Sequence, residues 1–158
     1  MLRQELQDQK GRKDLIKVVA AGDQGGVEMK NQSVEDLRKQ GFAVEDLGTN
    51  SADSVDYPDF AEKATAKVLA GQADLGILVC GTGIGISIAA NRQKGIRAAI
   101  LYDDYVAKVA REHNNANVLC FGGRTMTTED VLRRIGIFLK AVYEGGRHDR
   151  RLCKLDLD

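Results

Sequence analysis

The chain has 158 residues, a length that suits one domain built around a single core. Hydrophobic residues make up 43% and charged residues 29%, and 23 basic side chains balance 23 acidic ones, so no electrostatic footprint for nucleic acid is visible. No stretch resembles a membrane span or a signal peptide, and three cysteines without metal-like spacing favour free thiols in a reducing, cytoplasmic setting.

Apolar runs and amphipathic patterns alternate along the chain. Residues 1–14 are polar and lack an apolar stripe, so we expect a loosely ordered extension there, followed by a single domain at 15–158. In chain order, the expected elements are a strand at 15–21, a helix at 27–40, a strand at 42–48, a helix from Pro58 to 72, a strand at 75–80, a helix at 85–92, a strand at 95–101, a helix at 103–113, a strand at 116–122, and a helix at 127–145 capped by Thr127 or Thr128.

This alternation predicts parallel strands joined by right-handed crossovers, and the nearly continuous apolar runs predict a sheet covered on both faces. We therefore expect an α/β fold, a three-layer doubly wound sandwich with about five parallel strands, Rossmann-like in type. Ligands of such folds bind beyond the carboxyl ends of the strands. The loops expected to converge on one site are 22–26, 48–58, 80–85, 102–104 and 121–124.

A cysteine stands where the strand at 75–80 meets a glycine-rich turn. Gly81 to Gly85 can bring the unpaired amides of a helix N-terminus close to an anion, and those amides favour the thiolate form of Cys80. A thiolate beside such a cradle suits proton abstraction next to a carbonyl, and it suits acyl transfer equally well. The alternative is that Cys80 is a small buried residue that closes a strand.

Longer motifs resemble a known family, the ribose-5-phosphate isomerase B proteins and the related galactose-6-phosphate isomerase subunits. The likeness runs from about Ile16 to Arg151. The matching stretches are DLGT at 46–49, SVDYPDFA at 54–61, GILVCGTGIGISIAAN at 76–91, KGIRAA at 94–99, REHNNANVLCFGGR at 111–124 and YEGGRHDRR at 143–151.

The resemblance implies an enzyme that interconverts a phosphorylated aldose and ketose without metal or cofactor, in a homodimer or homotetramer that shares its active sites. It implies that Cys80 is the base that acts through an enediolate, that Thr82 assists, and that His113 is the acid that opens the sugar ring. The implied substrate-binding residues are Asp23, Tyr57, Gly81, Gly83, Ile84, Gly85, Asn114, Arg124, Arg147 and Arg151.

The residue types agree with these roles, although each has another interpretation. Arg147 and Arg151 are four apart, so on a helical turn their guanidinium forks face one way and suit a phosphate, whereas a basic tail is otherwise a solvated charge run. His113 changes charge near neutral pH, but it also suits the C-terminal cap of a helix. We expect His148 at the surface or in an interface, and structural roles for Cys120 and Cys153.

One position departs from the family pattern. After Asp23 the family usually has histidine, and here Gln24 follows. Glutamine donates hydrogen bonds to phosphate or sugar oxygens but carries no charge, so we keep Gln24 among the substrate-binding residues.

Three functions follow from the sequence. The first is isomerisation of ribose 5-phosphate and ribulose 5-phosphate. The second is the same reaction on a six-carbon sugar phosphate, such as allose or galactose 6-phosphate, or on a four-carbon one. The third is non-catalytic sensing of a sugar phosphate or nucleotide on the same fold. A membrane or nucleic-acid partner is not expected.

Overall fold

The computed structural model describes residues 16–156, so the expected extension at 1–14 lies outside the described residues. Strands and helices alternate within that range, as the sequence predicts. In chain order the elements are β1 (Lys17–Gly22), α2 (Val27–Lys39), β2 (Ala43–Asp46), α3 (Tyr57–Leu69), β3 (Leu75–Cys80), α4 (Ile84–Asn91), β4 (Ala98–Ile100), α5 (Asp104–Glu112), β5 (Val118–Gly122), α6 (Thr128–Lys140) and α7 (Arg147–Leu155).

The five strands form one sheet in the order β2-β1-β3-β5-β4, and every neighbouring pair is parallel. From β1 the chain first moves outward to β2 and then crosses back to β3 on the other side. The strand order therefore reverses between β1 and β3, which is where ligands bind in open α/β sheets. This topology confirms the predicted doubly wound fold.

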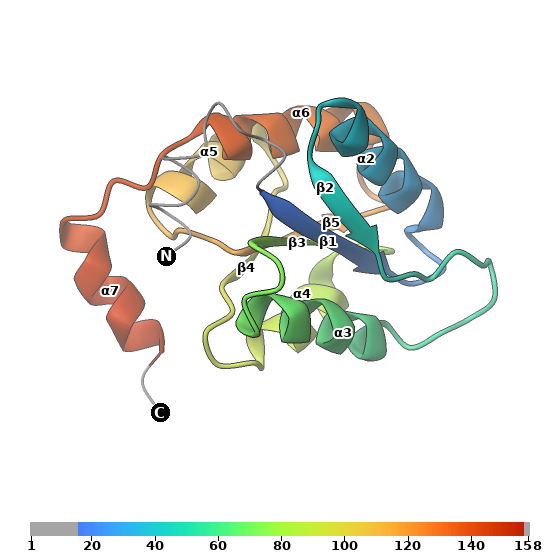
Figure 1. Ribbon diagram of the computed structural model, residues 1–158, viewed down its shortest axis with the longest axis horizontal. Helices are drawn as coiled ribbons and strands as arrows, with labels where there is room; N and C mark the ends of the chain where they lie inside the picture. The colour runs from blue at the N-terminus through green and yellow to red at the C-terminus, as the bar shows by residue number, and fades with distance from the viewer. Residues whose placement is uncertain (1–15, 157–158) are drawn as a thin grey trace.

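Helices cover both faces of the sheet. Figure 1 shows α2, α5 and α6 on one side and α3 and α4 on the other. Each side has its own apolar cluster: Phe121 of the sheet packs with Phe138 of α6 on one side, whereas Leu78 of the sheet packs with Ile86 of α4 on the other. The strands therefore bury side chains in both directions, which explains their nearly continuous apolar sequences.

Capping side chains fix where several helices begin. Pro58 lies in the first turn of α3, where its missing N–H costs nothing. The side chain of Thr127, rather than Thr128, caps α6 by accepting from the Asp130 amide at 3.2 Å, and Asp103 caps α5 in the same way.

The last long helix is shorter than the sequence predicts. We expected it to run to residue 145, but α6 ends at Lys140, and Ala141 is already extended. Beyond it, the buried Tyr143 anchors the chain, and Gly145 and Gly146 adopt positive φ angles that a right-handed helix does not use. The chain turns there and begins α7. The strands predicted at 42–48 and 95–101 are also shorter, at four and three residues.

Helix α7 lies apart from the three layers (Figure 1). Of its nine residues only His148 is buried. None of the helices within residues 16–156 has the length and apolar character that a membrane crossing requires.

A fully buried lysine fixes the turn that follows β2. The Lys30 ammonium lies 2.7 and 2.8 Å from the two carboxylate oxygens of Asp46, and 2.9 Å from the side-chain oxygen of Asn50. The Asp46 carboxylate also accepts a hydrogen bond from the Gly48 amide. The Gly48 carbonyl in turn accepts from the amide of Gly22, the last residue of β1. Lys30 therefore helps to position the loop that leads to the predicted site.

We expect Lys30→Ala to lower the free energy of unfolding by about 2–4 kcal/mol, because it leaves a partly buried carboxylate without its cation. Urea unfolding followed by circular dichroism measures this. The matched control is Lys39→Ala on the same helix, whose exposed ion pair with Glu35 contributes about 0.5 kcal/mol or less. Equal unfolding midpoints for the two variants would contradict this role of Lys30.

Candidate active site

Four of the five expected loops meet at the carboxyl edge of the sheet. The Gly123 amide donates to the Cys80 carbonyl at 2.8 Å, and the Asp23 amide donates to the Val79 carbonyl at 3.1 Å. A side chain at Gly123 would overlap the carbonyl oxygen of Gly25, so only glycine allows these backbones to approach so closely. Loop 48–58 joins them, because the Gly22 amide donates to the Gly48 carbonyl at 2.8 Å and the Tyr57 ring lies against Gly85. The predicted convergence of loops 22–26, 48–58, 80–85 and 121–124 is therefore confirmed.

Cys80 is the last residue of β3 and lies at the entry to α4. Its sulfur accepts a hydrogen bond from the Gly83 amide at 3.2 Å, and the Ile84 amide donates to the Thr82 hydroxyl oxygen at 3.2 Å. Cys80 is only 4% exposed, so it is a buried residue that closes a strand. It is also a thiol that faces a helix N-terminus, and such amides stabilise a thiolate.

Arg124 and Tyr57 border the same turn. The Arg124 guanidinium lies over Gly81, with Nη1 3.2 Å from where a β-carbon at that glycine would be. The Tyr57 ring lies against Gly85, where a β-carbon would come within 2.6 Å of a ring carbon. Glycine at both positions therefore lets a cation and a phenol reach the start of α4.

The first loop contributes Asp23 and Gln24. The buried Asp23 carboxylate accepts from the Gly25 amide at 2.8 Å, which holds this carboxylate at the edge of the sheet. The Gln24 side-chain oxygen accepts from the Val55 amide at 2.9 Å. Gln24, the residue that departs from the family pattern, therefore fixes the position of the backbone just before Tyr57.

The loop at 102–104 does not join the site, so the expectation for this loop was wrong. Asp103 caps α5, and Asp104 pairs with Arg133 and Arg134 of α6. Hydrogen bonds from the Arg133 guanidinium lower the pKa of Asp104 below its usual value. These contacts fasten α5 to α6.

Four of the expected site residues lie elsewhere in the same chain. His113 and Asn114 follow α5, which runs antiparallel to the strands and therefore ends near their amino edge. Asn117, just beyond them, accepts from the Gly76 amide near the start of β3, about 13 Å along the strand from Cys80. Arg147 and Arg151 lie on α7.

His113 is the C-terminal cap of α5, as one interpretation of the sequence expects. Its ring stacks on the ring of His148, with centroids 4.5 Å apart and planes inclined by 16°. His148 is 5% exposed, so it does not lie at the surface, which was one of the two places expected for it. The first turn of α7, which carries His148, lies against the end of α5 through this ring stack.

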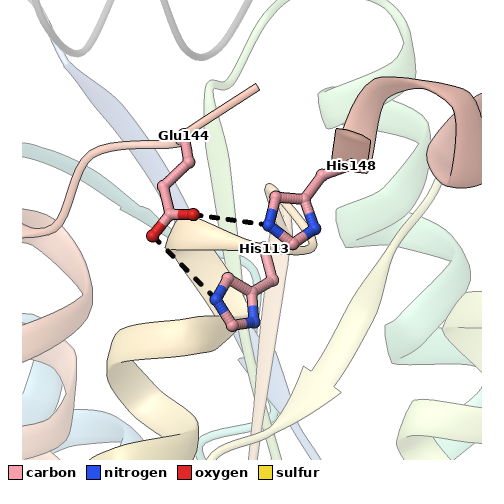
Figure 2. A group of neighbouring side chains, drawn as sticks. All are labelled: His113, Glu144 and His148. Atoms are coloured by element: carbon pink, nitrogen blue, oxygen red, sulfur yellow. Dashed lines mark ion pairs between the residues drawn. The ribbon is translucent and has the colours of Figure 1, made fainter. Parts of the chain in front are cut away.

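Glu144 lies beside both imidazole rings, and sequence reasoning missed it. Its carboxylate lies 3.4 Å from Nε2 of His148 and 4.0 Å from Nε2 of His113 (Figure 2). No local pattern indicates it, because Glu144 precedes α7 and the positive φ angles of Gly145 and Gly146 break the helical spacing between Glu144 and His148.

The other two cysteines differ from each other. Cys120 is fully buried, and burial, reinforced by the nearby Cys80, raises its pKa far above the usual value, so it stays a neutral thiol. Cys153 is exposed on α7, which gives no support to a structural role.

The site residues thus form two groups. One, at the carboxyl edge, contains Asp23, Gln24, Tyr57, Cys80, Gly81, Thr82, Gly83, Ile84, Gly85 and Arg124. The other, around α5 and α7, contains His113, Asn114, Arg147 and Arg151. A single chain does not bring the two groups together.

The chain is similar to known proteins over nearly all of its described residues. A family model described as Ribose/Galactose Isomerase matches residues 18–155. The ribose-5-phosphate isomerase B of Escherichia coli is 44% identical over 138 residues, which cover 87% of this chain and 93% of the relative. A probable ribose-5-phosphate isomerase B of Mycoplasma genitalium is 44% identical over 140 residues, covering 87% and 92%.

Solved structures agree. A crystal structure of ribose 5-phosphate isomerase from Thermotoga maritima has a TM-score of 0.88 and 46% identity, and the match covers 90% of this chain and 98% of the other. The Mycoplasma genitalium enzyme with bound ribulose-5-phosphate has a TM-score of 0.86 and 43% identity, covering 90% and 95%. On the strength of these matches, the chain belongs to the ribose/galactose isomerase family.

Proposed function

We propose that this protein is an aldose–ketose isomerase that interconverts ribose 5-phosphate and ribulose 5-phosphate. The observation that carries the proposal is the thiol of Cys80, which accepts from the Gly83 amide at the switch point of the sheet and has the Arg124 guanidinium nearby. Relatives at 44% identity are ribose-5-phosphate isomerases B, and one solved relative holds ribulose-5-phosphate.

In this proposal Cys80 is the base. The thiolate removes the proton from C2 of the open-chain aldose, the C–H electron pair forms the C1–C2 double bond, and negative charge develops on O1. Cys80 returns the proton to C1, while the O2 proton passes to O1 as the ketone forms. General acid–base catalysis of this kind requires the base within hydrogen-bond reach of the carbon-bound proton.

The turn after Cys80 holds the developing charge. Amides at a helix N-terminus stabilise an enediolate oxygen because they are oriented before the reaction begins. Gly81 to Gly85 supply these amides, with Thr82 assisting at the ring oxygen and Tyr57 lining the pocket. Asp23 accepts hydrogen bonds from sugar hydroxyls.

A second copy of the chain supplies the rest of the site. His113 opens the furanose ring, Asn114 binds substrate, and Arg147 and Arg151 bind phosphate, all from the partner. Three observations support a shared site. The two groups lie at different edges of one chain, and α7 stands apart in Figure 1. Ile84 and Ile88, on the helix that follows Cys80, are 55% and 53% exposed. Apolar side chains exposed next to one another suit a contact with another copy.

The proposed location is the cytoplasm, where the exposed Cys153 stays reduced.

A six-carbon sugar phosphate is the second candidate. The family model includes galactose isomerases, and Gln24 replaces the usual histidine. Catalytic efficiencies, kcat/KM, across ribose, allose, galactose and erythrose phosphates separate the candidates. We expect ribose 5-phosphate to rank first, and a higher kcat/KM on a hexose phosphate would replace it. Sugar-phosphate binding with no isotope exchange at C2 in deuterated water would favour the sensor.

Cys80→Ala is expected to lower kcat by about 10³-fold or more, because it removes the base while leaving the turn that binds oxygen. Circular dichroism and calorimetric titration with ribose 5-phosphate check that fold and binding persist. The matched control is Cys153→Ala, which removes an exposed thiol and should keep wild-type kcat. Full turnover by Cys80→Ala would show that another group is the base.

Complementation tests the shared site. Cys80→Ala and His113→Ala chains, co-expressed with different affinity tags, give mixed dimers in which one site has both wild-type residues and the other has neither. Such a dimer should recover about half of the wild-type rate, whereas each variant alone is inactive. If Cys80 and His113 of the same chain act together, the mixed dimer stays inactive.

Two changes at Gln24 separate its roles. Gln24→Ala frees the Val55 amide and should raise KM about fivefold with little change in kcat, since a net hydrogen bond contributes about 1 kcal/mol. Gln24→Glu keeps the acceptor for Val55 but adds negative charge. If Gln24 also faces phosphate, Gln24→Glu will raise KM more than Gln24→Ala does. A KM restored to the wild-type value by Gln24→Glu would limit Gln24 to holding the loop.

A further inference from the structure

Two imidazoles and one carboxylate meet where α7 begins. His113, Glu144 and His148 each offer one ligand atom, a ring nitrogen or a carboxylate oxygen, and these atoms all lie within 4.8 Å of one another. Figure 2 shows both rings turned toward the carboxylate, each reaching a different oxygen, at 4.0 Å for His113 and 3.4 Å for His148.

Backbone contacts hold these three side chains in place. The His113 amide donates to Val109 at the end of α5, and the Glu144 amide donates to the Glu112 carbonyl at 2.9 Å. The His148 amide donates to Gly145 in the turn that starts α7. The cluster therefore joins two segments that are distant in sequence, and it does not depend on a flexible loop tip.

One ring nitrogen of His148 lacks a hydrogen-bond partner within the described residues. Its Nε2 atom is buried and makes no hydrogen bond within the described residues, although the Glu144 carboxylate lies 3.4 Å away. A buried polar atom left in this state is costly. This nitrogen faces the Glu144 carboxylate, which the His113 ring also faces from a stacked position.

Two imidazole nitrogens and one carboxylate oxygen are donors that Zn²⁺ accepts in tetrahedral sites, at 2.0–2.2 Å from the metal. Ligand atoms at the corners of such a site lie roughly 3.4 Å apart. The separation of Glu144 and His148 already has this value. His113, which is 32% exposed in its side chain at a helix end, must tilt inward from the stacked arrangement.

We propose that His113, Glu144 and His148 bind a divalent transition-metal ion of the zinc class, and that the bound ion inhibits the enzyme. Binding uses the lone pair of His113 and releases any proton that the imidazole carried, so this histidine can no longer act as an acid. The metal is thus an inhibitor and takes no part in the reaction. The inhibition rests on the proposed function, whereas the binding does not.

The donor set also sets the selectivity. Mg²⁺ and Ca²⁺ require mainly oxygen ligands, and this cluster offers only one carboxylate. This cluster should therefore bind Zn²⁺, whereas Mg²⁺ at the same concentration should neither bind there nor inhibit the enzyme. A fourth position remains for water, because Glu144 is 44% exposed in its side chain.

Calorimetric titration with Zn²⁺ tests the binding directly. The background is Cys80→Ala with Cys153→Ser, so that neither thiol contributes. We expect one ion per chain. Glu144→Gln should weaken Zn²⁺ affinity at least about 100-fold, which exceeds the loss of affinity that follows when only a hydrogen-bond partner of a metal ligand is changed. Glu112→Gln is the matched control, since this carboxylate is adjacent to His113 but pairs with Lys108, and it should bind Zn²⁺ as the background does.

Inhibition of the otherwise wild-type enzyme is the second readout. Zn²⁺ should inhibit isomerisation, a chelator should restore it, and Glu144→Gln should need at least 10-fold more Zn²⁺ for the same inhibition. His148→Gln provides a second variant with the same expected loss of sensitivity. Equal sensitivity of wild type and Glu144→Gln would show that the ion acts away from this cluster and would overturn the proposal.

The two readouts separate this inference from the proposed function. Absence of Zn²⁺ binding in an active isomerase would refute the metal site alone. Zn²⁺ binding that depends on Glu144, in a chain without isomerase activity, would support the metal site and refute the function.

Discussion

The close approach of three backbones at the carboxyl edge of the sheet is the constraint on which the rest of the molecule depends. Gly25 and Gly123 touch where no side chain fits, and the Gly123 amide bonds to the Cys80 carbonyl. This packing fixes the turn after β3 between its neighbours. The Gly83 amide is thereby held against the Cys80 sulfur, at a distance of 3.2 Å.

A second consequence is the division of the site residues. Parallel strands with returning helices place a residue that follows a strand at one edge and a residue that follows a helix at the other. Cys80 belongs to the first class and His113 to the second. Within the proposed function, a second chain is therefore a chemical requirement, because a base and an acid must both reach one sugar.

Much of the fold is readable from the sequence because local and tertiary preferences agree. The run Leu75–Cys80 is apolar throughout, is followed by a glycine-rich turn and forms a strand with the predicted bounds. The end of α6 was not readable, since the residues after Lys140 have ordinary helical composition. The backbone becomes extended at Ala141 and leads to the buried Tyr143, so the helix ends where a tertiary contact begins.

The site shows the same limit. Glycine and cysteine signal the turn at residue 80 because backbone geometry demands particular residues there. His148 carries no such signal: its burial depends on how α7 folds onto α5, which no local pattern specifies. Gln24 could be noted as unusual from the sequence, but its bond to the Val55 amide required the fold.

The central claim is that one sugar phosphate lies between Cys80 of one chain and the α7 arginines of another. A crystal structure of the Cys80→Ala protein with ribulose 5-phosphate tests it most directly. We predict C1 and C2 of the sugar beside residue 80, and the phosphate against Arg147 and Arg151 of the second chain. A sugar phosphate held entirely by one chain, away from residue 80, would contradict the account.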